Sequence, residues 1–350
     1  MRRLVAGAMA ALGMAMSAPA TGAAARPLVV ILAQAEGTEV TDLFTPYAIL
    51  AESGAVDVRV VAASRRPARL TSGVAWVTPQ MTFAELASSR PDGPDVVIVP
   101  ALAREDDPAL LAWLRAQAKG GARIMSVCNG GRVLAATGLL DGRQAAVHWF
   151  SVAGMARAHP KVTWRRDARW VEDGPFISTT GISASAPATL NLLRELSGEA
   201  TMQATAQRLG LPPPQARHDG TAYRLSLRHM TTVAGNVVAT WGHQDVAVPL
   251  TPGFDEIAFA TTIDGWSRTF RSKAWATGPA VVTSRHGLTV RRARTPPAAF
   301  DRRIALPARD PMVATFQAIR GAYGDRTARF VATQFEHPWA VGGRAAFSGG

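Results

Sequence analysis

The 350-residue sequence predicts an α/β protein in which helices cover both faces of a parallel sheet. Its short apolar runs, such as LVVILA at 28–33, are continuous rather than alternating, which is typical of strands that are buried on both faces. Helical patterns separate these runs, as consecutive parallel strands require. A composition with 47% hydrophobic and 18% charged residues supplies enough apolar side chains for a full core.

Strands and helices alternate along the first 210 residues. Buried strands are predicted at 28–33, 56–63, 73–79, 95–100 and 122–127, and a strand pair at 162–179. Helices are predicted at 43–54, at 107–119, directly after Cys128, at 151–160 and at 186–198. In the first of these helices we expect Thr45 to be the N-cap, Pro46 the first helical residue and Gly54 the stop.

The first 25 residues have the pattern of a secretory signal peptide. Two arginines precede an apolar run at 4–18 that is too short and too rich in alanine for a membrane span, and small residues follow at 23–25, where cleavage is expected. An alanine-rich disordered start is the alternative. A signal peptide implies a periplasmic or secreted protein, and its single cysteine has no internal disulfide partner.

A proline-rich and glycine-containing linker at 211–220 divides the remaining chain into a domain at 27–210 and a C-terminal α/β region at 221–350. The C-terminal region reads as strand-rich and contains weak echoes of the first domain. It is therefore either a degenerate, truncated second copy or an unrelated α/β extension. Aligned as a copy, it places Ala258 opposite Asp42 and Gln334 opposite Cys128.

The net charge of +12 comes almost entirely from scattered arginines, with no dense basic run, so we expect no nucleic-acid partner. The histidines lack the spacing of zinc sites, and there is no dinucleotide or phosphate-binding motif. We therefore expect no metal and no cofactor. Apart from the export signal, we expect no membrane partner.

The only cysteine, Cys128, lies where a buried strand meets a helix, in the segment IMSVCNGGRVL. A sharp turn at this position exposes a nucleophile and requires small neighbours, which Gly130 and Gly131 provide. The first amides of the following helix favour a thiolate. Asp42, and Ala101 with Leu102, also follow strands and so lie at the same edge of the sheet. The alternative is a buried, inert cysteine.

Several motifs resemble the ThiJ/PfpI superfamily, which is related to class I glutamine amidotransferases. They are DLFTP at 42–46, the stretch from DVVIVP to SVCNGGR at 95–132, GLLDGRQAAVHW at 138–149 and RWVEDGPFISTTGISAS at 169–185. The match is closest to the branch of isonitrile hydratases and the sensor domains of AraC-type regulators. The resemblance covers about residues 27–207 and implies a flavodoxin-like sandwich that is usually dimeric.

The resemblance also implies roles for individual residues. Cys128 matches the family nucleophile, and Asp42 matches the acid that contacts it. In isonitrile hydratases the acid passes a proton while cysteine attacks the isonitrile carbon, and hydration of the thioimidate releases an N-substituted formamide. From the residues alone, Asp42 could instead cap a helix.

The sequence departs from the family pattern at two places. Asn129 follows the cysteine, where peptidase-like members have histidine and isonitrile hydratases have threonine. Ala101 and Leu102 stand where the family often has a Gly-Gly pair whose amides hold an oxyanion. We expect Asn129, Gly130, Ala101 and Leu102 to contact substrate. His148 matches a family histidine near the pocket and is either an acid/base partner or a structural residue.

Two functional hypotheses follow. The first is a small-molecule hydratase or hydrolase of isonitrile-hydratase type, a lyase with Cys128 as nucleophile. The second is a non-catalytic ligand-binding or thiol redox-sensing module related to the regulator sensor domains. In either case the partner is a small molecule, and the assembly is a homodimer or an internal pseudo-dimer in which residues 221–350 cover the dimerisation face.

Overall fold

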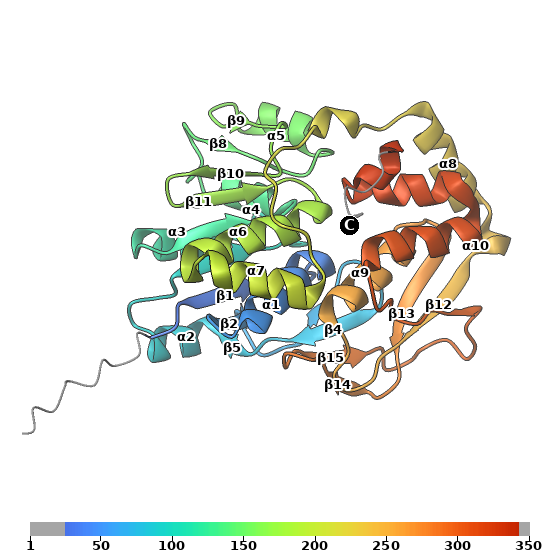
Figure 1. Cartoon of the computed structure of the whole chain (residues 1–350), viewed down its shortest axis with the longest axis horizontal. Helices are drawn as coiled ribbons and strands as arrows, with labels where there is room; N and C mark the ends of the chain where they lie inside the picture. The colour runs from blue at the N-terminus through green and yellow to red at the C-terminus, as the bar shows by residue number, and fades with distance from the viewer. Residues whose placement is uncertain (1–24, 343–350) are drawn as a thin grey trace, which may run out of the picture.

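The computed structural model describes residues 25–342 (Figure 1). The expected signal peptide therefore lies almost wholly outside the described residues. Between residues 25 and 342, no helix combines the length and the apolar character that crossing a membrane requires.

The first domain is built on one seven-stranded sheet with the order β10-β11-β7-β6-β1-β2-β5. Neighbouring strands are parallel except for β10, which runs antiparallel to β11. The strands are β1 (Leu28–Leu32), β2 (Asp57–Ala62), β5 (Met81–Thr82), β6 (Val96–Val99), β7 (Arg123–Ser126), β10 (Trp170–Asp173) and β11 (Phe176–Thr179). The parallel sheet that the apolar runs predict is confirmed.

Helices cover both faces of this sheet. Successive residues of β1 point into two different cores: Val29 and Ile31 face one, and Val30 and Leu32 face the other. The first core lies under α1 (Val40–Ser53), α6 (Ser185–Ser197) and α7 (Glu199–Leu209), and the second under α2 (Phe83–Ser89), α3 (Pro108–Lys119) and α4 (Gly130–Ala136). A strand buried on both faces has no polar side, so its sequence is continuously apolar.

Helix α1 begins earlier than the sequence predicts. Its N-cap is Glu39, whose carboxylate accepts a hydrogen bond from the Asp42 amide, so the expected cap at Thr45 is wrong. Pro46 lies inside the helix, where its missing N–H leaves only the carbonyl of Asp42 without its usual helical partner. Consequently Asp42 is in the first turn of α1, and its side chain does not cap the helix.

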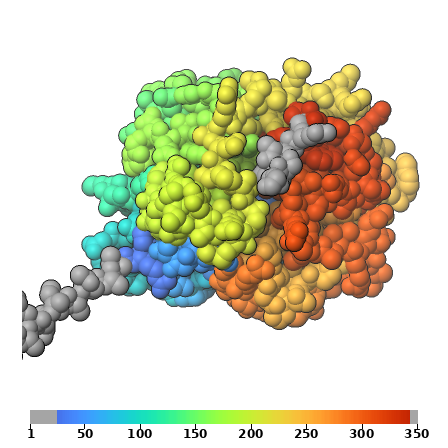
Figure 2. All heavy atoms as spheres, in the orientation of Figure 1, coloured from blue at the N-terminus to red at the C-terminus, as the bar shows by residue number. Residues whose placement is uncertain are grey.

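The strand expected at 73–79 joins a different sheet. It forms β4 (Ala75–Thr78) in an antiparallel sheet with the order β14-β15-β4-β3. This sheet combines β3 (Ala68–Arg69) of the first domain with β14 (Val281–Thr283) and β15 (Thr289–Arg292) of the C-terminal region. The two halves of the chain therefore share a sheet, and Figure 2 shows them as one continuous body.

The C-terminal region is α/β as predicted, but it contains more helix than strand, so its strand-rich interpretation is wrong. It contains α8 (Leu227–Val238), α9 (Glu256–Ser267) and α10 (Pro311–Gln334), which changes direction at Gly324. Its parallel strands are β12 (Gln244–Pro249), β13 (Ser272–Thr277) and β16 (Arg302–Arg303). The remaining short elements of the described chain are β8 (Gln144–Ala145), α5 (Val152–Ala158), β9 (Thr163–Trp164) and the 3-10 helices η1 (Ile182–Ala184), η2 (Gly220–Ala222), η3 (Thr240–Gly242) and η4 (Pro338–Val341).

The strands β16, β12 and β13 form a parallel three-stranded sheet, which we call the second sheet. Their order, β16-β12-β13, repeats the order β6-β1-β2 of the seven-stranded sheet. Asp255 caps α9 by accepting from the Ala258 amide, as Glu39 caps α1 by accepting from the Asp42 amide. The similarity between the C-terminal region and the first domain ends at α10. Residues 328–334 are helical, so up to residue 342 the region shows no second elbow, and Gln334 is not in a position like that of Cys128.

Helices α1 and α9 pack against each other and join the two regions. The rings of Phe44 and Phe259 meet edge to face with their centroids 5.5 Å apart. At the other end of the contact, the imidazole of His286 lies between the carboxylates of Glu52 and Glu256, 3.0 Å from each. The C-terminal region thus covers the face of the first domain that α1 presents.

Candidate active site

Cys128 occupies a strained turn between β7 and α4. Its backbone φ is +55°, a conformation that non-glycine residues rarely adopt. Its amide donates to the Thr179 hydroxyl at 3.2 Å. At Gly130, a Cβ atom would lie 1.9 Å from the Val99 carbonyl oxygen, so only glycine fits at this position. The sequence segment after β7 therefore folds as a tight elbow with the thiol at its apex.

Asp42 lies beside this elbow and is fully buried. Its Oδ2 atom accepts a hydrogen bond from the Ala101 amide at 3.0 Å, whereas Oδ1 has no hydrogen-bond partner among residues 25–342. Burial and the neighbouring Glu39 carboxylate raise the pKa of Asp42 well above its ordinary value. Asp42 is therefore suited to hold a proton on Oδ1 at neutral pH.

The Cys128 thiol is also buried, with 4% of the residue exposed. Burial raises its pKa well above the ordinary value, and the carboxylates of Asp42 and Glu39 add to this effect. Arg268 and the backbone amide of Asn129 lower the pKa by a smaller amount. Both shifts favour the uncharged forms, a neutral thiol on Cys128 and a protonated carboxyl group on Asp42.

Arg268, the C-cap residue of α9, brings a positive charge to the site from the C-terminal region. Its guanidinium lies 3.2 Å from the Glu39 carboxylate and 2.5 Å from that of Asp264. Burial raises the pKa of Asp264 to about 7, although Arg268 opposes the shift. Sequence reasoning missed Glu39 and Arg268. The only available indication was an acidic residue at a helix N-cap position three residues before Asp42.

We expect Arg268→Gln to destabilise the protein by about 2–4 kcal/mol, because the substitution leaves two buried carboxylates without a counter-charge. The midpoint and slope of urea unfolding at pH 7 measure this change. Arg65→Gln is the matched control, because it removes an exposed ion pair with Glu85 and should leave the unfolding midpoint almost unchanged. Equal losses in the two variants would contradict a structural role for the Arg268 cluster.

The other residues predicted for the site make contacts within the protein or are buried. The Asn129 side chain accepts a hydrogen bond from the Ser151 hydroxyl at 2.7 Å, and the Gly130 amide donates to the Val127 carbonyl at 2.7 Å. The Ala101 amide is taken by Asp42, and Leu102 is buried. The structure therefore does not present the Gly130 and Ala101 amides as a free oxyanion hole.

His148 is buried, and main-chain groups engage both of its ring nitrogens. Nε2 lies 2.8 Å from the Gln334 carbonyl oxygen, and Nδ1 lies 3.3 Å from the Phe150 amide. Burial lowers the pKa of His148, which favours the neutral imidazole. This geometry supports the structural role of His148 over the acid/base role.

The end of α10 packs against the loops beside the elbow. The Trp149 indole donates to the Thr333 carbonyl at 2.9 Å, and the Ser183 amide donates to the Phe335 carbonyl at 2.9 Å. The Phe335 ring also lies under the Arg268 guanidinium, 5.9 Å from its centroid. This segment therefore contributes to burying the candidate site.

Glu336 fixes the same segment through a buried carboxylate. It accepts hydrogen bonds from the Trp149 amide at 2.6 Å and from His218 at 3.1 Å, and it lies against Gly181. Burial opposes ionisation of Glu336, but these hydrogen bonds outweigh it and lower the pKa. The C-terminal segment is thus attached by an ionised side chain as well as by main-chain bonds.

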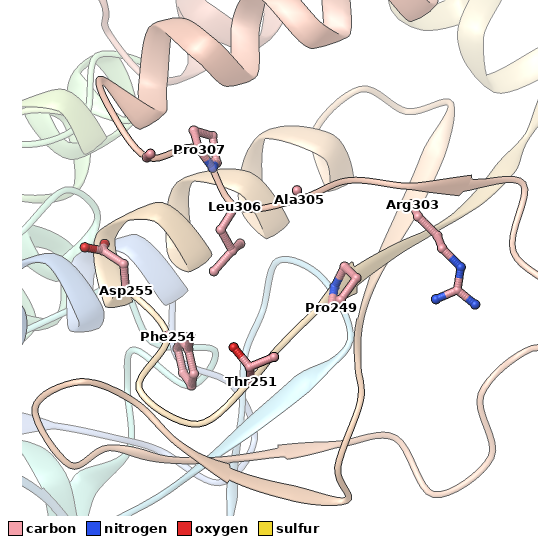
Figure 3. Close-up of a pocket in the computed structure, with 9 residues that line it drawn as sticks. Pro249, Thr251, Phe254, Asp255, Arg303, Ala305, Leu306 and Pro307 are labelled. Carbon is pink, nitrogen blue, oxygen red and sulfur yellow. The ribbon is translucent and has the colours of Figure 1, made fainter.

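A separate open pocket of about 470 Å³ lies in the second sheet (Figure 3). It is formed where β12 and β16 end and α9 begins, and its walls include Phe254, Asp255, Arg303 and Leu306. The corresponding position in the seven-stranded sheet is where β1 and β6 end and α1, which carries Asp42, begins. Neither Cys128 nor Asp42 lines it.

Comparison with known proteins identifies relatives of the first domain. Residues 28–195 match the DJ-1/PfpI family. An isonitrile hydratase from Pseudomonas putida is 30% identical over 181 residues, which cover 49% of this chain and 73% of that enzyme. The HTH-type transcriptional regulator CdhR from Pseudomonas aeruginosa is 32% identical over 136 residues, which cover 37% of this chain but only 40% of the regulator.

Among solved structures, a mutant DJ-1 superfamily protein from Salmonella typhimurium aligns with a TM-score of 0.47 and 25% identity, over 53% of this chain and 99% of that protein. The 30% identity that extends over nearly three quarters of the isonitrile hydratase agrees with the motifs at 42–46, 95–132 and 169–185. The chain belongs to the DJ-1/PfpI family.

Proposed function

We propose that this chain is a small-molecule hydratase of isonitrile-hydratase type, in which Cys128 is the nucleophile and Asp42 carries the proton. The observation that supports this most directly is the pairing of a thiol on a strained elbow with a buried carboxyl group whose Oδ1 is unpartnered among the described residues. The similarity to an isonitrile hydratase supports the choice of substrate class.

In the first stage, the Cys128 sulfur forms a bond to the terminal carbon of R–N≡C. Asp42 donates its proton to the same carbon, and the thiol proton replaces it on the carboxylate. The product is the thioimidate R–N=CH–S–Cys128. No oxyanion forms in this stage, so this stage does not require the Ala101 amide, which Asp42 already occupies.

In the second stage, water adds to the thioimidate carbon while Asp42 accepts a proton from it and passes a proton to nitrogen. Collapse of the adduct breaks the C–S bond, releases R–NH–CHO and returns the proton to sulfur. The balance is one isonitrile and one water consumed for each formamide formed. A neutral substrate suits this site, because a buried thiol and a buried carboxyl group stay neutral more easily than charged.

Substrate must reach a thiol that is 4% exposed, so we propose that the segment at 333–337 moves during the reaction. Its polar contacts are hydrogen bonds to Trp149, Ser183 and His218, whereas the Phe335 ring is fully buried in the core. Movement of the segment would exchange these hydrogen bonds for water and would also uncover the Phe335 ring.

Incubating the full chain with a small alkyl isonitrile and following the formyl proton by NMR tests the proposal. Formation of the N-alkyl formamide at a rate proportional to enzyme concentration is the expected result. No product above the buffer control, with Cys128 still titratable after unfolding, would overturn the hydratase proposal.

Asp42→Asn should lower the hydration rate by about 10²–10⁴-fold, because asparagine keeps an acceptor for the Ala101 amide but cannot donate an acidic proton. The wild-type rate should fall as pH rises through the raised pKa of Asp42, and the variant should show no such fall. Alkylation of Cys128 by iodoacetamide should become faster, since removing the carboxylate lowers the pKa of the thiol.

Asp255→Asn is the control, because it makes the same substitution at the N-cap of α9, the counterpart of Glu39 in α1, and lies outside the proposed machinery. It should leave both hydration and alkylation unchanged. If Asp42→Asn behaved like this control, Asp42 would not be the proton carrier.

A non-catalytic ligand-binding module is the second candidate, because the Ala101 and Gly130 amides are both engaged within the protein. A redox sensor fits less well, since sensor thiols are exposed and have a low pKa, whereas burial raises the pKa of Cys128. Isonitrile binding without consumption, measured by calorimetry and NMR together, would favour the binding module.

We further propose that the C-terminal region replaces the second subunit of a family dimer. The repeated strand order, the shared sheet and the packing of α9 on α1 support this internal pseudo-dimer. We also propose that the protein is exported to the periplasm or beyond. The mature N-terminal sequence, expected to begin near residue 25, tests the export.

A further inference from the structure

Helix α8 presents an apolar face to the outside of the molecule. It lies at the edge of the C-terminal region, beside α10 (Figure 1). Leu227 is 78% exposed, Met230 61% and Val238 68%, and Trp241, just after the helix, is 86% exposed. Leu225 and Val237 are also exposed. We call these six residues the α8 patch.

The helix is oriented opposite to an ordinary surface helix, because its polar side faces the protein. Asn236 is its buried residue and donates hydrogen bonds to the Thr269 carbonyl at 2.8 Å and the Thr327 hydroxyl at 3.3 Å. The His243 ring lies 2.8 Å from the Asn236 carbonyl oxygen, and His229 packs over Phe330. These bonds hold the apolar side outward, where a monomer gains nothing from it.

The α8 patch has positive charge around it. Arg224 and Arg228 are exposed beside it, and the sequence contains no aspartate or glutamate from residue 220 to residue 244. The whole chain carries a net charge of +12. An apolar face with a cationic rim is complementary to a surface whose outer layer is anionic and whose deeper layer is apolar.

We propose that the α8 patch docks on an anionic phospholipid bilayer. The helix has 12 residues and is about 18 Å long, too short to span a bilayer, so it would lie in the plane of the interface. Trp241 would sit at the headgroup level, as indole rings do at membrane surfaces, while the two arginines reach the lipid phosphates.

A second copy of the chain is a poorer occupant. Pairing of two α8 patches would bring the same cationic rims together, with no carboxylate between 220 and 244 to neutralise them. The sequence predicts no membrane partner apart from the export signal. It does not reveal this surface, because tertiary contacts of Asn236 set the outward direction of the apolar side.

Co-sedimentation of the full chain with vesicles tests the proposal. Wild type should bind equimolar phosphatidylglycerol and phosphatidylcholine vesicles at low salt, bind pure phosphatidylcholine vesicles at least tenfold more weakly, and lose most of its affinity in about 0.5 M salt. The triple variant Leu227→Ser, Met230→Ser, Trp241→Ser should bind at least tenfold more weakly than wild type. Arg224→Gln with Arg228→Gln should remove much of the preference for the anionic lipid.

Val281→Ser, an exposed apolar residue on β14 outside the patch, is the matched control and should bind like wild type. All variants carry the same N-terminal residues, so any contribution from these cancels in the comparison. Vesicle binding that is absent, or equal in wild type and the triple variant, would overturn the proposal. A concentration-dependent dimer that the triple variant abolishes, without vesicle binding by wild type, would assign the α8 patch to self-association instead.

Discussion

Cys128→Ala should abolish formamide production, with a fall of at least about 10³-fold in turnover, because the covalent route through sulfur is lost. Alanine fills the same turn with one atom fewer, so the fold should persist with a small loss of stability. Cys128→Ser should also be nearly inactive, since a buried hydroxyl is a much weaker nucleophile than a thiol. The formyl-proton assay measures the activity, and thermal unfolding verifies the fold.

Ser126→Ala is a suitable control for Cys128→Ala. Ser126 is buried in β7, two residues before the elbow, and has no part in the proposed chemistry. It should keep wild-type turnover. Turnover by Cys128→Ala that matched this control would show that hydration, if observed, does not use the thiol.

Gly130→Ala should destabilise the protein by about 3–5 kcal/mol, because the added Cβ would overlap backbone that cannot move freely. The new atom would lie 1.9 Å from the Val99 carbonyl oxygen and 3.0 Å from the Pro100 carbonyl carbon. Relief requires the elbow to move away from β6, which would also displace Cys128 from Asp42. Urea unfolding monitored by tryptophan fluorescence measures the loss.

Gly154→Ala in α5 provides the contrast, since its backbone is helical and a Cβ added there would meet no neighbouring atom within 4 Å. It should be neutral or stabilising by up to about 1 kcal/mol, because alanine favours the helix. Unfolding curves for Gly130→Ala and Gly154→Ala that superimposed would refute the close packing of the elbow.

The sequence predicts the first domain well because each strand is buried on both faces. LVVIL of β1 and VVIV of β6 carry no polar residue, and only a covered parallel strand combines that pattern with flanking helices. The start of α1 could not be predicted as easily. Thr45 and Pro46 form a local start signal, but capping by Glu39 and burial of Val40 and Leu43 outweigh it.

In the candidate site, too, some residues can be identified from local sequence patterns and others cannot. Cys128 follows β7, and Asp42 lies in the first turn of the helix that follows β1, so local sequence patterns are enough to identify them. Arg268 lies 229 residues beyond Glu39, and their contact depends on how α9 packs against α1. The α8 patch was missed for a related reason: the helix pattern shows that one side is apolar, whereas only the bonds of Asn236 show that this side faces outward.

The most direct test of the account is to detect the covalent intermediate on Cys128. Wild-type protein mixed with excess isonitrile is acid-quenched at successive times, and its intact mass and proteolytic peptides are measured. The hydratase mechanism predicts a mass increase of one isonitrile, confined to the peptide that contains Cys128, appearing before the formamide and absent from Cys128→Ala. Formamide production with Cys128 unmodified at every time, and undiminished in Cys128→Ala, would contradict it.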